Sequence, residues 1–523
     1  MPSKLRKLVA PQKINIKINL ASRQKTWTTK DRIEGSVSIT PPTDTRFDEI
    51  EIEFVGTSRT YVERLTTAAA VSGRSQAFHQ FLKLQQPGLP GQYPEDGILK
   101  AAQTYDFSFV FVIPQQLLPR VCRHKIASEA VREAHLCLPP TLGDKDVANT
   151  KNALDDMAPD MVSVRYGIFC SISRVKTHDD NEPSKITLAS KARKLRVIPA
   201  ISELPPLDVG GEGSEYVLRR EKNIRKGMLK GKLGVLSMEA AQPQPLHMRL
   251  TDPESRASTM ATVMLRFDPS EESSRPPRLS TLGSKLKVCT FFASSARHDF
   301  PRKENSLLDM SQGCHTEQLN LSSRCVANVE WTACEPTKPN TIERRDSACS
   351  TTSTSLHAGE VPAPSSGSKG KTYYSARLLI PISLPTNKAF VPTFHSCLSS
   401  RIYQLKLELT LSSLGPSLDL KLPVQISSEG RTADAHPRRD SIASNDDEEE
   451  EEEEVDADYF FAPRTVRAPS EGFVGRSRIG SQAPGSEDAP PGYEVLARRH
   501  MSVPAEGGVG VSLMPAAALG GVH

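Results

Sequence analysis

The chain has 523 residues and a formal net charge of only +4, with 37% hydrophobic residues and 40 prolines. This length is too great for one compact core, so it predicts two domains, and the low apolar and high proline content predicts further segments outside them. No apolar run approaches the roughly 20 residues that cross a bilayer, so no transmembrane segment is expected. The first ten residues lack the apolar stretch of a signal peptide, so no signal peptide is expected either.

In the first half of the chain, apolar residues alternate with polar ones in several segments. These segments are residues 14–20, 33–39, 50–54, 105–113 and 162–172. A period of two places one face of a strand in a core and leaves the other face toward water, as half-buried antiparallel sheets require. The clearest run, Tyr105 to Ile113, is stopped by Pro114.

The same alternation returns in the second half. The segments are residues 261–267, 286–292, 403–411 and 418–426. Between the last two, residues 412–417 contain a Gly and a Pro placed to reverse the chain. No segment of comparable length has helical spacing. The predicted fold class is therefore all-β, with two β-sandwich domains joined by a short hinge and followed by a disordered C-terminal tail.

Composition shifts predict the domain boundaries. The predicted order is a disordered start (1–12), a first sandwich (13–198), a second sandwich (199–430) and a disordered acidic tail (431–523). Three prolines between residues 199 and 208 indicate the connector between the sandwiches. Residues 335–371 are rich in Ser, Thr and Pro and are predicted to form a disordered loop inserted in the second sandwich.

Cysteine usage and motif searches point away from catalysis. Nine cysteines are scattered from Cys122 to Cys397, with no CxxC pair and no His/Cys cluster at metal-ligand spacing, which is typical of reduced thiols that pack in cores. His395 lies near Cys397, but the pair matches no nucleophile motif. Neither a P-loop, GxGxxG, GxSxG nor HExxH is present. We therefore expect no enzyme activity, no cofactor and no metal site.

Charge is unevenly distributed along the chain. From residue 430 onward there are 18 acidic and 9 basic residues, so this tail carries −9 and the preceding part +13. A basic body is attracted to anionic lipid headgroups or to acidic protein segments. The alternative is association of the tail with the body of the same protein.

One segment concentrates the basic residues around a single acid, Glu221. The cations are Arg219, Arg220, Lys222, Arg225, Lys226, Lys230 and Lys232. They are candidates for contact with an acidic partner or the membrane surface, while a solvated basic face is the alternative. Because aromatic residues are not interleaved with these cations, no nucleic acid is expected as a partner.

The tail contains the sharpest linear motif, Pro490-Pro491-Gly492-Tyr493. Successive prolines favour an extended polyproline II conformation, which docks in the aromatic groove of a WW domain while the tyrosine fills a neighbouring slot. No lysine follows Lys421, so an enzyme that docks at Tyr493 and modifies lysines would have to act on the core or on a bound partner. The alternative is that an acidic tail that uses arginine lacks lysine by composition alone.

Basic residues precede three serines at spacings that suit basophilic kinases. The candidate phosphorylation sites are Ser347, Ser441 and Ser502. Ser502 also has the arginine and proline spacing that 14-3-3 proteins favour. Because Ser502 lies only nine residues from Tyr493, a 14-3-3 dimer there would crowd the WW-binding motif.

Several segments, in this order, resemble arrestins. The matching segments are Phe47 to Gly56, Tyr105 to Pro114 followed by Leu118-Pro119, Leu138 to Gly143, Val164 to Ile168, and Phe390 to Cys397 followed by Ile402-Tyr403. The first two resemble arrestin N-domain strands, and the last resembles the closing strands of fungal arrestin-like proteins. Together they cover roughly residues 13–430 and are similar to the arrestin-related trafficking adaptors.

The resemblance implies an arrestin fold and a non-enzymatic adaptor function. Many members of this family with PPxY tails recruit HECT-type ubiquitin ligases to membrane transporters and receptors, which promotes cargo ubiquitination and endocytosis. It implies a cytoplasmic protein that is recruited to the plasma membrane or endosomes. The alternative is a trafficking or signalling scaffold of the arrestin and retromer-subunit kind that does not depend on a ligase.

Overall fold

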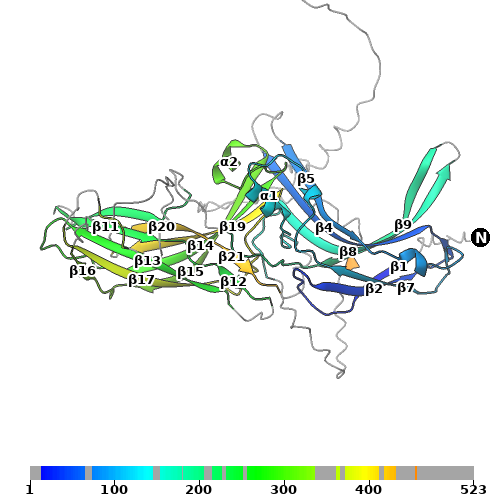
Figure 1. Cartoon of the computed structure of the whole chain (residues 1–523), viewed down its shortest axis with the longest axis horizontal. Helices are drawn as coiled ribbons and strands as arrows, with labels where there is room; N and C mark the ends of the chain where they lie inside the picture. Colours follow the sequence, from blue (N-terminus) through cyan, green and yellow to red (C-terminus); the bar gives the residue numbers. More distant parts are fainter. Residues whose placement is uncertain are drawn as a thin grey trace, which may run out of the picture. The chain divides into compact units, whose positions relative to one another are not determined.

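The structure is a computed structural model. It describes residues 13–64, 73–144, 154–178, 181–204, 215–226, 231–250, 256–335, 361–365, 371–411, 417–430 and 454–455. Within these ranges most residues lie in strands that build two β-sandwiches (Figure 1), and both sandwiches belong to one compact unit. The predicted all-β fold class is confirmed. No helix in the described ranges is long and apolar enough to cross a membrane.

The first sandwich consists of two main sheets. The smaller sheet contains β1 (Asn15–Leu20), β2 (Arg32–Thr40) and β7 (Tyr105–Val112), in that order. The larger sheet has the order β22 (Glu454–Val455), β9 (Asn181–Leu195), β8 (Val162–His178), β4 (Glu49–Arg64) and β5 (Gly73–Gln85). Adjacent strands in both sheets run antiparallel.

Short elements connect these strands. They are β3 (Thr45–Arg46), which pairs with β6 (Ile98–Leu99), the 3-10 helices η1 (Leu89–Gln92) and η2 (Pro119–Val121), and α1 (Glu129–Leu136). α1 has only eight residues, with Ser128 in extended conformation at its N-cap, and it buries Val131, Ala134 and His135. The segment from η2 to α1 contributes to the functional region described below.

The second sandwich is also built from two main sheets. One has the order β10 (Arg219–Arg225), β11 (Lys232–Ala240), β13 (Ser258–Pro269), β17 (Tyr373–Ser383) and β16 (Thr332–Cys334). The other has the order β15 (Gln312–Cys325), β14 (Thr281–Ala293), β19 (Ser399–Thr410) and β18 (Phe394–His395), and β20 (Ser417–Val424) also pairs with β19. β12 (Leu246–Met248) runs parallel to β21 (Ile426–Ser428), and α2 (Lys303–Leu308) follows β14.

The alternation read from the sequence matches the cores. On β7, Phe107, Phe109 and Phe111 are buried while the residues between them are exposed. The predicted hairpin of residues 403–426 is present, since β19 and β20 pair from Tyr403 opposite Val424 to Thr410 opposite Ser417. Each sandwich therefore buries the apolar face that its sequence period predicts, and this burial is the main favourable contribution to its folding.

One strand departs from the expectation of a single buried face. On β8, Ser163, Arg165 and Phe169 are buried as well as the predicted apolar residues. β8 lies between β4 and β9 in the larger sheet, and the burial of these three side chains shows that its second face is also covered. Phe169 packs against Val55 and Ala192 there, in a small cluster separate from the main core. A central strand of this kind is buried on both faces, so period two alone underestimates its burial.

Each apolar core contains a few side chains from the other half of the chain. Phe292, Val391 and Phe394 come from the second half of the chain but belong to the core of the first sandwich. Met157 lies in the first half but belongs to the core of the second sandwich. The described part of the connector, up to Leu204, also contacts the second sandwich, because Ile201 and Ser428 exchange two backbone hydrogen bonds. The boundary between residues 198 and 199 stays a prediction.

The tail and loop predictions fall largely outside the described residues. This applies to residues 1–12, to most of 335–371 and to nearly all of 431–523. The described exception in the tail is β22, whose Glu454 and Val455 lie opposite Arg193 and Ala192 of β9.

Candidate functional site

The linear motifs of the sequence analysis are not among the described residues. Those outside the described ranges are Pro490, Pro491, Tyr493, Ser347, Ser441, Ser502 and Lys230. The proposals of WW-domain binding and phosphorylation therefore stay predictions. The structure does place the other basic residues of the segment, and it shows the contacts between the two sandwiches.

The basic segment forms an edge strand with a partly neutralised charge. Arg219 to Arg225 make up β10, which pairs with β11 at the edge of its sheet. Arg220 lies 3.7 Å from the carboxylate of Asp419, and Lys226 lies 2.7 Å from that of Glu271. Acidic neighbours thus balance part of this charge, as expected for a solvated face.

Other cations of this segment also have local acceptors. Arg219 pairs with Glu221 and with Glu239, and its guanidinium donates to the carbonyl of Ala363 at 2.8 Å. Lys222 donates from Nζ to the carbonyl of Ser417 at 3.0 Å. These contacts tie β10 to its own sandwich.

Two cations of the segment remain exposed at the end of the β10–β11 hairpin. Arg225 and Lys232 are register partners across the two strands. Like charges opposite each other destabilise a strand pair slightly. An anionic partner would relieve this repulsion, so the hairpin end is the part of the segment best suited to contact one.

Polar contacts join the two sandwiches. Arg401 of β19 is fully buried, and its Nη1 donates to the carbonyl of Asp156 at 3.0 Å. Lys388 donates from Nζ to Asp155 at 2.7 Å and to Glu317 at 3.1 Å. Asp155 and Asp156 precede β8 in the chain, whereas Arg401, Lys388 and Glu317 belong to the second half. The guanidinium and ammonium groups thus fix the segment before β8 against the second sandwich.

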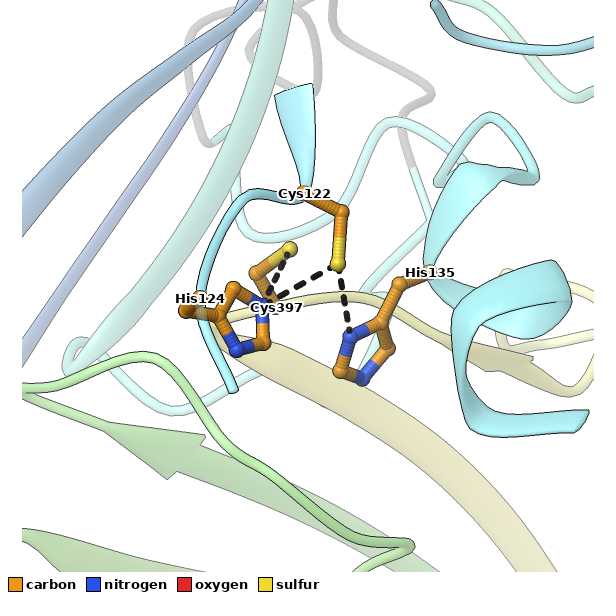
Figure 2. Close-up of side chains that lie close together, drawn as sticks. All are labelled: Cys122, His124, His135 and Cys397. Atoms are coloured by element: carbon orange, nitrogen blue, oxygen red, sulfur yellow. Dashed lines mark hydrogen bonds between the residues drawn. The ribbon is translucent and has the colours of Figure 1, made fainter. Parts of the chain in front are cut away.

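A group of thiols and imidazoles lies at the same junction. Cys122 directly follows η2, His124 comes two residues later, His135 lies in α1, and Cys397 lies in the turn between β18 and β19. One potential ligand atom from each residue lies within 4.8 Å of the others. Figure 2 shows the four side chains pointing toward one another. Three of the four are buried, and His124 is half-buried.

Distances within this Cys/His cluster are those of direct contacts. His124 Nε2 lies 3.2 Å from Cys122 Sγ and 3.3 Å from Cys397 Sγ, and His135 Nδ1 lies 3.7 Å from Cys122 Sγ (Figure 2). Burial, with His124 and Arg297 nearby, lowers the pKa of His135 to about 4. Burial and the neighbouring Cys122 raise the pKa of the Cys397 thiol. In this arrangement His135 is a neutral imidazole.

The spacing of His and Cys residues in the sequence does not predict this cluster, because its members come from distant segments. Cys397 lies 273 residues from its neighbour His124. His395, which is close to Cys397 in the sequence, is not among the four residues of the cluster, whereas His124 Nε2 lies 3.3 Å from the Cys397 sulfur. A signal was nevertheless present, since Cys122-Arg123-His124 places two ligand types within three residues.

Comparison with known families gives a match for part of the chain. Residues 314–428 match the family model described as the Bul1 C terminus. The match covers about a fifth of the chain, from within β15 to the end of β21, and includes Cys397. That family consists of C-terminal domains of arrestin-related adaptor proteins. A comparison with curated proteins finds no match for the chain.

Proposed function

We propose that the protein is a non-enzymatic adaptor that brings a WW-domain HECT ubiquitin ligase to membrane transporters or receptors. The observation that carries this proposal is the match of residues 314–428 to the Bul1 C terminus, a domain of adaptors associated with the Rsp5 ubiquitin ligase. The same chain contains Pro490-Pro491-Gly492-Tyr493, a motif of the type that WW domains bind. The two features support one function, because the motif supplies the docking site that a ligase adaptor needs.

The proposed mechanism is induced proximity. The two sandwiches bind cytosolic segments of a cargo, and Tyr493 holds the ligase nearby. Linking two modest interactions raises the effective concentration of the ligase at the cargo lysines without any new contact between ligase and cargo. In this proposal the protein acts in the cytoplasm and is recruited to the plasma membrane or endosomes, and ubiquitination leads to endocytosis of the cargo.

Capture of the full-length chain by immobilised WW domains tests ligase docking. We expect the wild-type chain to bind and the Tyr493→Ala variant to lose binding, because the tyrosine fills one of the two slots of the WW groove. Tyr459→Ala is the matched control, since Tyr459 lies in the same tail outside the motif, and it should bind like the wild type. Equal capture of the Tyr493→Ala variant would refute docking through this motif and favour the ligase-independent scaffold.

Phosphorylation of Ser502 is the proposed off-switch. A 14-3-3 dimer bound to phosphorylated Ser502 would cover Tyr493, which lies nine residues away. A phosphorylated tail peptide should therefore bind either the 14-3-3 dimer or a WW domain. Simultaneous binding of both partners to one peptide, measured by analytical ultracentrifugation, would contradict the switch. Ser347 and Ser441 are proposed as further kinase sites.

Contact with anionic lipid is proposed for the hairpin end at Arg225 and Lys232. The full-length chain should co-sediment with phosphatidylserine vesicles more than with neutral vesicles, because each cation near an anionic surface contributes about 1 kcal/mol. The double charge reversal Arg225→Glu with Lys232→Glu should abolish this difference. Arg220→Glu is the control, because Arg220 already lies beside Asp419. Unchanged binding of the double variant would leave the basic segment as a solvated face.

A further inference from the structure

The Cys/His cluster offers the ligand set of a structural zinc site. Two cysteine sulfurs and two histidine nitrogens converge at the junction of the sandwiches, and their potential ligand atoms lie within 4.8 Å of one another. Zn²⁺ binds four such ligands in tetrahedral geometry, and Cys₂His₂ is one of its common structural sets. We propose that Cys122, His124, His135 and Cys397 bind one zinc ion, which joins the first sandwich to the second.

The distances fit this coordination with small movements. Zinc–sulfur bonds of about 2.3 Å and zinc–nitrogen bonds of about 2.0–2.1 Å place tetrahedral sulfur and nitrogen ligands about 3.6 Å apart. The three contacts in the cluster are 3.2, 3.3 and 3.7 Å. Each of these three differs from the ideal separation by no more than about 0.4 Å. No two ligand atoms are more than 4.8 Å apart, so side-chain rotations that close the widest pair by about 1 Å complete the site.

A hydrogen bond at one ring nitrogen of His124 leaves the other ring nitrogen free to bind a metal. His124 Nδ1 lies 3.0 Å from the carbonyl oxygen of Lys125. A carbonyl accepts hydrogen bonds only, so this contact places the proton on Nδ1 and leaves the lone pair of Nε2 free. Nε2 is the atom that faces Cys122 and Cys397 (Figure 2). Metal-binding histidines are commonly oriented by such a contact at their other nitrogen.

A buried cation, Arg297, lies beside the cluster and limits the charge that the site can hold. Arg297 is buried, and it donates from Nη2 to the carbonyl of Leu398 at 3.1 Å. Its Nε and Nη1 have no hydrogen-bond partner among the described residues. Its backbone amide also donates to the carbonyl of Cys397 at 2.9 Å, and a buried cation at this position opposes any added positive charge. A zinc ion with two thiolates and two neutral imidazoles has no net charge and meets this condition.

Zinc binding is balanced by proton release. One Zn²⁺ binds the sulfurs of Cys122 and Cys397 and the lone pairs of two neutral imidazoles, and the two thiol protons pass to water. No oxidant or reductant is consumed. A disulfide between the same cysteines would instead require loss of two electrons as well as two protons. Metal content and covalent state therefore separate the two chemistries.

The site would act as an interdomain clamp. Cys122, His124 and His135 come from the segment of η2 and α1, whereas Cys397 comes from the turn before β19 of the second sandwich. A structural zinc ion contributes directly to folding stability, because its binding free energy is available only when its ligands are assembled. Here that free energy would hold the two sandwiches together in addition to the polar contacts of Arg401 and Lys388.

Zinc content of the purified full-length chain tests the proposal. We expect about one zinc per chain in the wild type and at least about a tenfold lower content in Cys122→Ser and Cys397→Ser, because each loses a ligand. The control is Cys325→Ser, since Cys325 is exposed on β15 and should not affect zinc content. Absence of zinc from the wild type, or equal zinc in wild type and Cys122→Ser, would overturn the proposal.

A second measurement covers the case in which the serine variants fail to fold. Zinc is removed from the wild-type chain with a chelator and replaced by Co²⁺, whose visible bands report tetrahedral geometry and whose near-ultraviolet band reports thiolate ligands. Cys397→His keeps four ligands, so it should keep the visible bands and lose about half of the thiolate band. A wild-type spectrum without the thiolate band, or a Cys122–Cys397 cross-linked peptide after non-reducing digestion, would refute the site.

Discussion

Gly35 is a position where a single added methyl group should be costly. It lies on β2, between β1 and β7, with Leu20 and Phe109 as its register partners. A Cβ atom at Gly35 would lie 2.1 Å from the carbonyl oxygen of Asn19 and 2.6 Å from Cζ of Phe109. Carbon atoms in favourable contact are about 3.5–4.0 Å apart, so the overlap with the ring is about 1 Å, and the overlap with the backbone is greater.

The Gly35→Ala variant should therefore lose stability. The ring of Phe109 could rotate, but the Asn19 carbonyl belongs to β1 and moves only if the β1–β2 pairing shifts. Overpacking of this kind costs about 1–3 kcal/mol, and the backbone contact places the expected loss near the upper end, at about 2–3 kcal/mol. For a domain of this size, such a loss lowers the unfolding temperature by roughly 5–10 °C.

Scanning calorimetry of the full-length chain measures this loss. Gly283→Ala is the control, because Gly283 also lies in a strand and its added Cβ would meet only the Glu408 carbonyl, at 4.0 Å. Combining Gly35→Ala with Phe109→Leu should recover only part of the loss, because the Asn19 contact remains. If Gly35→Ala unfolds at the same temperature as Gly283→Ala, the predicted close approach of the three strands is refuted.

Three further predictions concern a buried hydrogen bond, an ion pair between the sandwiches and the docking motif. Tyr166→Phe should lower the free energy of unfolding by about 1–2 kcal/mol, as measured by urea denaturation. The reason is that the buried Tyr166 hydroxyl donates to the carbonyl of Pro139 at 2.6 Å. Lys388→Met should reduce stability by less than about 1 kcal/mol near neutral pH, because Asp155, its partner, is well exposed. Burial raises the pKa of Asp155, but hydrogen bonds from Lys388 and Met157 outweigh this effect and lower it below 3.8. A lowered folded-state pKa gives stability that is present above the unfolded-state pKa and lost as pH falls through the folded-state value, so the effect of Lys388→Met should vanish in acid. Ubiquitin remnants on lysines up to Lys421 should disappear from cells that express Tyr493→Ala.

Each of these predictions has a matched control. Tyr105→Phe should cost less than Tyr166→Phe, because the Tyr105 hydroxyl only accepts a hydrogen bond from the Lys100 amide at an exposed position; an equal cost would contradict the first prediction. Lys406→Met should not change the pH dependence, and an identical slope for Lys388→Met would contradict the second. Tyr459→Ala should leave ubiquitin remnants unchanged, and remnants that persist in Tyr493→Ala would contradict the third.

The fold was predictable because apolar burial in these sheets follows the alternation of side chains. Residues 105–113 show this for β7, where each predicted apolar residue from Phe107 to Ile113 is buried. β8 was predicted only in part, because its second face is covered by residues that are distant in sequence. Burial of Arg165 lies beyond a period-two argument, since it depends on Asp144, 3.9 Å away.

The junction was less predictable than either sandwich. Arg401 has no special sequence context, and its role follows from carbonyl groups at Asp156 and Met157 that only the fold brings near. The Cys/His cluster depends in the same way on Cys397, which reaches His124 across the junction. In contrast, the Pro490-to-Tyr493 motif can be identified from sequence alone, because a linear motif is defined by residues that are adjacent in the chain.

β22 has a consequence for the distance over which a docked ligase could act. Val455 is fixed opposite Ala192 of β9, and Tyr493 follows 38 residues later. Because a chain spans at most about 3.3–3.6 Å per residue, Tyr493 can lie no farther than about 130 Å from that strand, whatever path the intervening residues take. If a ligase docks at Tyr493 as proposed, the segment from Val455 to Tyr493 tethers it to the edge of β9, and the length of this segment limits which lysines the ligase can reach. Shortening or lengthening the segment between Val455 and Pro490 should shift the set of modified lysines without altering either the sandwiches or the docking motif.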